Sequence, residues 1–117
     1  MKITLDTILR ISGSAADDRR VAEEFAREAL TEAEARFGQL YDLRVGKVIL
    51  DAAGLRTAWD ACVGIRHLHA LLQEAVEFHR RSELQKIFVA AHEKVKEMQQ
   101  TGDAIYLRLS QLCPDRV

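Results

Sequence analysis

The feature of this sequence that most constrains its fold is the scarcity of proline, since only one occurs in 117 residues. That residue is Pro114, close to the carboxyl end. Proline removes a backbone donor and clashes with the preceding helical turn, so a chain without it can form long helices. Hydrophobic residues make up 48% and charged residues 30% of the chain, a balance typical of one globular domain. The sequence predicts a single all-α domain over residues 1–117.

Apolar residues recur at helical spacing from the amino end, and glycines mark the expected helix ends. A short helix is expected over residues 4–12, ended by Gly13, with a short extended segment as the alternative because Ile3 and Leu5 alternate. The next helix is expected over 15–37, with Ser14 as its cap and Gly38 as its end.

Residues 39–53 are the most ambiguous region. One helical face carries apolar residues there, and Gly54 would stop that helix. Residues 43–50 also fit a hairpin about Gly46. Helix is favoured because two isolated strands are marginal without a sheet.

A long helix is expected over residues 55–80, and its apolar residues surround it on most sides. Such a helix lies in the middle of a bundle or between subunits. Trp59 would anchor either arrangement. Gly64 indicates a close helix crossing. Together these segments predict an antiparallel bundle of four main helices plus a short N-terminal helix.

The last third of the chain carries a long apolar stripe. Ser82 and Gln85 form the S-x-x-Q pattern of a capping box before it. Alternating steps of four and three residues then select Leu84, Phe88, Ala91, Val95, Met98, Gly102, Ile105, Leu109 and Leu112. This period of 3.5 is typical of coiled coils. The stripe predicts either one long helix or a helix broken at 101–103.

The stripe has two interpretations. It packs within the chain and completes the core, or it is a seam for another chain. On the second interpretation, the interface residues are Leu84, Phe88, Val95, Met98, Ile105 and Leu109, with Trp59 as an anchor.

No catalytic, cofactor-binding or metal-ligating pattern emerges from the residue spacing. His67 and His69 are two apart, so on a helix they point in different directions and cannot share a metal. A site assembled from several helices remains an alternative, from His69 and His79 with Glu74 or His92. No glycine pair has phosphate-loop spacing. Cys62 has no evident base and is expected to behave as a small hydrophobe.

The formal net charge of −1 gives no global field that would attract nucleic acid or an anionic membrane. A local patch from Arg56, Arg66, Arg80 and Arg81 is the remaining route to nucleic-acid binding. Two cysteines without a CxxC pair, and no signal or membrane segment, suit a reducing cytoplasm.

These observations predict a non-enzymatic protein–protein interaction module, such as an adaptor, inhibitor, small assembly subunit or chaperone. It is expected to self-associate through its C-terminal helix, most simply as a dimer. The alternatives are a small helical nucleic-acid-associated protein and a metal-dependent helical enzyme with a His/Glu site.

Overall fold

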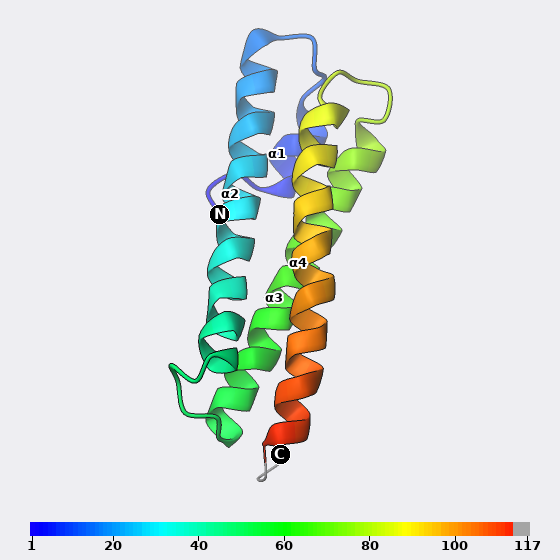
Figure 1. Ribbon diagram of the computed structural model, residues 1–117. Helices are drawn as coiled ribbons and strands as arrows, with labels where there is room; N and C mark the ends of the chain where they lie inside the picture. The colour runs from blue at the N-terminus through cyan, green and yellow to red at the C-terminus, as the bar shows by residue number, and fades with distance from the viewer. Residues whose placement is uncertain (114–117) are drawn as a thin grey trace.

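The computed structural model describes residues 1–113, and all regular secondary structure in that range is helical. Four helices pack against one another: α1 (Leu5–Arg10), α2 (Ala16–Arg44), α3 (Ala52–Phe78) and α4 (Gln85–Leu112). Figure 1 shows α2, α3 and α4 side by side along a rod, with the short α1 beside their upper part. The rod measures 54 × 21 × 21 Å. The expectation of an all-helical chain is confirmed.

The expected number of long helices is wrong, because α2 is one helix where two were expected. It runs through Gly38 without a break. An added Cβ at Gly38 would meet nothing within 4 Å, and this glycine keeps an ordinary helical conformation. A glycine ends a helix where it adopts a left-handed conformation that lets the last carbonyls find donors. Gly38 does not do so, and the described chain therefore has three long helices and one short helix.

The helix α2 ends at Arg44, and Gly46, two residues beyond, has a φ of 78°. The N–H of Gly46 donates to the carbonyl of Leu43 at 3.2 Å, and that of Lys47 donates to the carbonyl of Asp42 at 2.9 Å. These two bonds form a Schellman motif. The region 43–50 is therefore neither a hairpin nor a helix over its full length, but a helix end followed by a connection.

The helix α3 starts earlier than expected because Asp51 caps it. The Asp51 carboxylate accepts a hydrogen bond from the N–H of Gly54 at 2.7 Å. Gly54 consequently lies inside the first turn of α3 rather than ending a preceding helix. An added Cβ there would lie 2.8 Å from the carbonyl oxygen of Ile49, so the tight connection requires glycine.

The helix α4 is continuous through Gly102, and the alternative of a break at 101–103 is wrong. A Cβ at Gly102 would lie 3.0 Å from Leu40 Cδ1 and 3.8 Å from Ile65 Cδ1. Gly102 is thus the point where α4 comes close to both α2 and α3. Its missing side chain makes room for its neighbours and does not stop the helix.

Two expected caps act differently in the structure. Ala15 occupies the cap position of α2 in place of Ser14, and no side chain bonds the first turn there. Asp18 instead accepts hydrogen bonds from the backbone N–H groups of Ser12 and Gly13, at 3.2 and 3.0 Å. Ser82 accepts a bond from the N–H of Leu84 at 3.0 Å, so it shapes the turn before α4 without completing a capping box.

The core runs the length of the rod, and all four helices contribute buried residues to it. The α2 contribution includes a column of fully or nearly fully buried alanines, Ala22, Ala26, Ala29 and Ala33. Phe25 packs edge-on against Phe88 of α4, with ring centroids 6.1 Å apart. Because alanine side chains are short, they allow α2 to lie close to α3 and α4.

Gly64 marks a close contact between α2 and α3, in which a side chain of α2, and not its backbone, approaches α3. A Cβ at Gly64 would lie 3.1 Å from Nε of Arg36. The long Arg36 side chain therefore lies across α3 where that helix has no side chain. Its guanidinium remains 3.6 Å from Glu32, one turn earlier on α2.

Within residues 1–113, no helix is both long and apolar enough to cross a bilayer. Pro114, expected to follow the last helix, lies outside the described residues.

Candidate interaction surface and histidine pair

The residues expected to form an intermolecular seam lie largely inside the molecule. Five of them are at most 6% exposed: Leu84, Phe88, Val95, Ile105 and Leu109. Met98 is partly buried against the same core. The structure therefore corresponds to the first interpretation of the stripe, in which α4 completes the core of its own chain. Only Leu112, at the end of the stripe, is largely exposed.

Trp59 has a different environment, because it lies on the outer side of α3 with 44% of its surface exposed. Its ring is 5.3 Å from that of Tyr106 on α4, measured between centroids. The Arg66 guanidinium lies 5.4 Å from the centre of the Trp59 ring and 3.1 Å from the Asp103 carboxylate. This arrangement holds the indole in place against the junction of the two helices while leaving it open to solvent.

A shallow groove of about 390 Å³ extends from Trp59 toward the start of α3. It is lined by Ala52, Ala53, Leu55, Arg56, Trp59 and Tyr106. Most of the lining is apolar, with Arg56 as the one charged side chain. Val63 continues the apolar surface one turn further along α3 and is 43% exposed. Val63 and Tyr106 were missed as candidates, and Arg56 was considered only for nucleic-acid binding, because the sequence shows the periodicity of α3 but not which side α2 and α4 leave uncovered.

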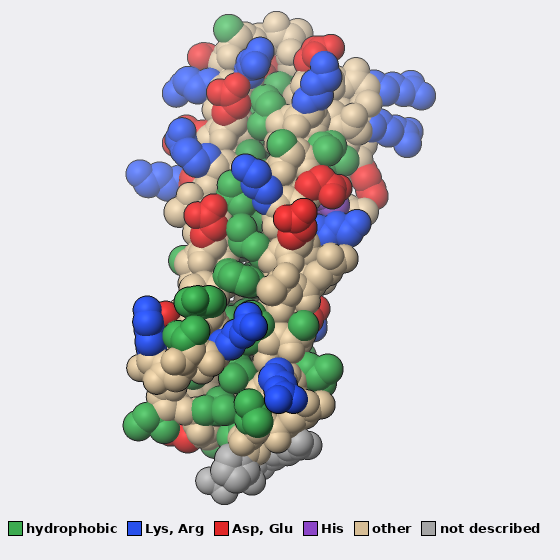
Figure 2. Space-filling model, viewed as in Figure 1, with side chains coloured by type: hydrophobic (Ala, Val, Ile, Leu, Met, Phe, Trp, Pro, Cys, Tyr) green, Lys and Arg blue, Asp and Glu red, His purple; other side chains and the backbone are tan. Residues whose placement is uncertain are grey.

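A second apolar region lies at the end of the rod where α2 passes into α3. Tyr41, Val45 and Val48 are about half exposed, and Ile49 is 81% exposed. Figure 2 shows hydrophobic side chains at this lower end, whereas charged side chains crowd the upper part of the visible face. Single exposed hydrophobic residues are ordinary, but their concentration at one end is typical of interaction surfaces.

Two of the four histidines meet between α3 and α4. The rings of His69 and His92 lie 4.3 Å apart, tilted by 32°. The His92 Nε2–H donates to the side-chain oxygen of Gln73 at 3.3 Å. His69 Nε2 is fully enclosed and has no hydrogen-bond partner among residues 1–113.

The pKa of His69 lies below its usual value, chiefly because burial disfavours the charged imidazolium. The neighbouring His92 and Lys96 lower it further, and Glu93 acts in the opposite direction. This pair is a boundary contact that favours a neutral His69.

The remaining members of the conjectured His/Glu site do not join this pair. His79 is buried at the end of α3, where its Nε2–H donates to the carbonyl oxygen of Ile8 at 2.8 Å. It therefore fixes α1 to the bundle. Glu74 is exposed on the outer side of α3. Among residues 1–113, no three potential metal-ligating side chains lie close enough to hold one ion.

Cys62 is buried in the core, and its thiol points to the carbonyl oxygen of Gly102 at 3.6 Å. Burial, followed by the nearby Asp103 carboxylate, raises the pKa of this thiol to about 11. A thiol with so high a pKa is almost entirely protonated near neutral pH and is a poor nucleophile.

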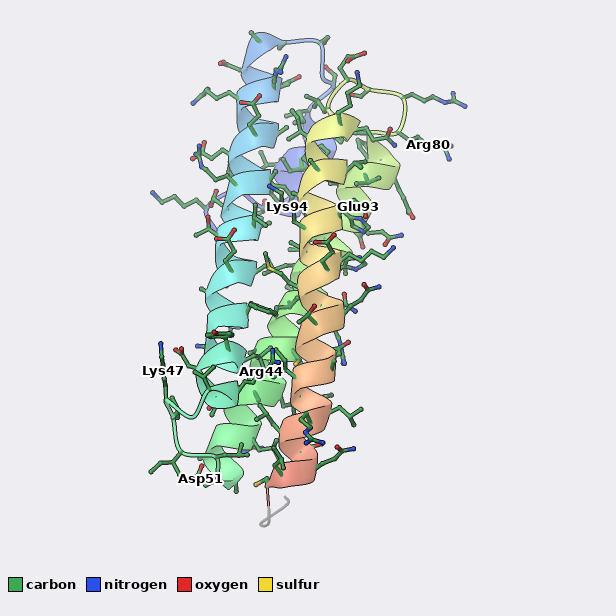
Figure 3. All side chains as sticks on the ribbon, viewed as in Figure 1. Arg44, Lys47, Asp51, Arg80, Glu93 and Lys94 are labelled. Carbon is green, nitrogen blue, oxygen red and sulfur yellow. The ribbon has the colours of Figure 1, made fainter. Side chains whose placement is uncertain are left out.

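The arginines considered for nucleic-acid binding are spread along the rod. Arg56 lies in the first turns of α3, while Arg80 follows its last turn, about 36 Å away at the rise of a helix. Arg66 is already paired with Asp103. Figure 3 shows Arg80 projecting outward near the upper end, far from Arg44 and Lys47 at the lower end. These side chains do not gather into one patch.

No protein-family model, curated protein sequence or solved structure matches this chain.

Proposed function

We propose that this chain is a non-enzymatic interaction module, an adaptor, inhibitor, small assembly subunit or chaperone, that binds protein and associates with itself. A two-fold dimer is the simplest closed form for such self-association. The bundle is proposed to be antiparallel, with α4 packed in a coiled-coil-like manner. In support, the chain reverses direction at each long connection in Figure 1, and the stripe with the 3.5-residue period is mostly buried.

The observation that carries this proposal is the size of the exposed surface. The chain exposes 7425 Å². Monomeric proteins of 13.2 kDa expose about 6,400 Å². The difference of about 1,000 Å² is comparable to the roughly 800 Å² that each partner covers in a standard protein–protein interface. Self-association would bring the solvent-exposed surface per chain back toward the ordinary range.

The nature of that surface agrees with a protein partner. Large apolar side chains remain exposed on α3, on α4 and in the α2–α3 connection, among them Trp59, Val63, Leu107, Leu112 and Ile49. Aromatic residues held in place by neighbours are typical anchors of interfaces. On α4, the residues available to such an interface are Leu107 and the exposed stripe end Leu112, and not the buried remainder of the stripe.

The proposal is tested by sedimentation velocity and light scattering across low to high micromolar protein. A self-associating chain shows a mass that rises with concentration to a plateau at twice the mass of one chain. A constant mass of one chain at high micromolar concentration would contradict self-association.

A further inference from the structure

We propose that the outer face of α3 is where two copies of this chain meet, with their α3 helices in opposite directions. The α3 outer face is defined as Arg56, Trp59, Val63, Ala70, Glu74 and Glu77. This inference rests on the self-association proposed above and assigns it a surface.

These six residues lie in a line on one side of α3, which also carries the exposed Asp60, Arg66 and His67. Their spacings of three, four and seven residues keep them on the same side of a helix. All six are exposed. The opposite side of α3 is already occupied, because it packs against α1, α2 and α4. The α3 outer face is therefore the side of the central helix that the fold leaves without a partner.

On either side of Arg66 and His67, the middle of this line is apolar. Trp59 and Val63 are 44% and 43% exposed, and Ala70 follows two turns later. Alanine at this point permits close approach of a second helix backbone. The Arg66 side chain beside the line is neutralised by Asp103, so it brings little net charge to the centre.

The outermost residues of the line carry opposite charges, with the exposed Asp60 one turn inside Arg56. Arg56 is near the start of α3, whereas Glu74 and Glu77 are near its end. None of the three makes an ion pair with any other described residue. Glu77 accepts only a hydrogen bond from the side-chain amide of Gln73, at 3.2 Å.

This polarity selects the partner and its direction. A two-fold axis between positions 66 and 67 places Arg56 opposite Glu77 of the second copy, Trp59 opposite Glu74, and Val63 opposite Ala70. Each contact then occurs twice, as symmetry requires. A parallel pairing would place Arg56 against Arg56 and the glutamates against one another, which is repulsive.

The apolar connection between α2 and α3 is the competing surface, and it lacks this complementarity. Its central cation, Lys47, already lies 3.7 Å from Asp42 of the same chain. Ile49 is the most exposed hydrophobic residue of that connection. It therefore supplies a matched control for substitutions on α3.

The first experiment compares Val63→Asp with Ile49→Asp by sedimentation velocity. We expect Val63→Asp to remain a monomer at concentrations where the wild type and Ile49→Asp are dimers. Circular dichroism should show equal helicity in all three proteins, because both substituted side chains are exposed. A dimer that survives Val63→Asp, or that is lost with Ile49→Asp alone, overturns the assignment to α3.

The second experiment uses charge reversal at exposed positions, which leaves the core untouched. Arg56→Glu alone and Glu77→Arg alone should each weaken the dimer about tenfold, because two facing pairs become repulsive. Mixing these two variants should restore wild-type affinity, since both facing pairs of the mixed dimer again join one acidic and one basic side chain. A chain that carries both Arg56→Glu and Glu77→Arg should also dimerise with wild-type affinity. Failure of both restorations overturns the antiparallel pairing.

These experiments distinguish the failure of self-association from the failure of the α3 outer face as its surface. A wild type that stays monomeric at high micromolar concentration removes both the proposed function and this inference. A wild-type dimer that is insensitive to Val63→Asp and to the charge reversals leaves the proposed function standing and removes the α3 outer face as its surface.

Discussion

At the scale of single residues, His69 couples the stability of the fold to pH. Its Nε2 is enclosed at the α3–α4 boundary, beside His92 and near Lys96. Protonation there places a positive charge where water is scarce and where other cations are close. The native state consequently resists protonation more than the unfolded chain does.

We expect the free energy of unfolding to decrease as the pH falls below about 6.5, the ordinary pKa of histidine. Because the pKa of His69 is lowered by folding, the unfolded chain takes up the proton first. The stabilisation that comes from keeping His69 neutral is complete above that pH and is lost as the pH falls through the native pKa of His69. Denaturant titrations at pH 7.5 and pH 5.5 measure the difference.

The variant His69→Phe should flatten this pH dependence, since it keeps a planar ring and removes the titrating group. His67→Phe is the matched control, because His67 is exposed on the same helix. An unchanged pH dependence in His69→Phe, or an equal change in both variants, would contradict the role given to His69.

At the scale of the helices, two glycines within helices have opposite roles. An added side chain at Gly38 would meet open space, whereas one at Gly102 would press on Leu40. We expect Gly38→Ala to raise the free energy of unfolding by about 1 kcal/mol through helix propensity. Gly102→Val should lower it by about 1–3 kcal/mol through overpacking. Thermal and denaturant unfolding measure both changes.

A volume-matched control is Gly38→Val, which should be close to neutral. If Gly38→Val and Gly102→Val lower the free energy of unfolding by similar amounts, helix propensity decides the effect, and packing where three helices meet does not.

These glycines also show how far the sequence predicts the helices. Periodicity located the helical segments and the buried line of α4, because side-chain spacing is a local property. It did not locate the helix ends, because Gly38, Gly46, Gly54 and Gly102 look alike in a sequence. The left-handed φ of Gly46 and the proximity of Leu40 to Gly102 depend on hydrogen bonds and neighbours that only the folded chain has.

At the scale of the whole molecule, the three long helices make a rod and not a sphere. The Cα radius of gyration is 16.4 Å. A compact domain of this length has a radius of gyration of about 13 Å. The elongation is the source of the surplus exposed surface, and we propose that a second copy covers part of it.

Small-angle X-ray scattering on Val63→Asp, the variant expected to be monomeric, should give a radius of gyration of about 16 Å or slightly more, as the Cα value implies. An unbroken α2 and an unbroken α4 together require this length. A value near that of a compact domain would mean that one of them is bent back on itself, as the expected four-helix arrangement implied.

The candidate surface was less predictable than the fold. Trp59 was singled out from the sequence, but the residues grouped with it belong to the core, because a single apolar stripe is equally suited to cover its own chain or another. What distinguishes the α3 outer face is the absence of a neighbour on one side of a central helix. That is a property of how α2 and α4 are placed, and no local pattern encodes it.

The column of alanines on α2 has a consequence for how this protein tolerates sequence drift. Ala22, Ala26, Ala29 and Ala33 are buried, so a larger side chain at any of them would have to displace core neighbours. Random mutagenesis would therefore find this stretch nearly invariant in size, while Tyr41, Val48 and Ile49 at the far end accept many replacements without loss of folding. Homologues of this chain would be recognised by a spaced run of small residues sooner than by any charged or aromatic signature.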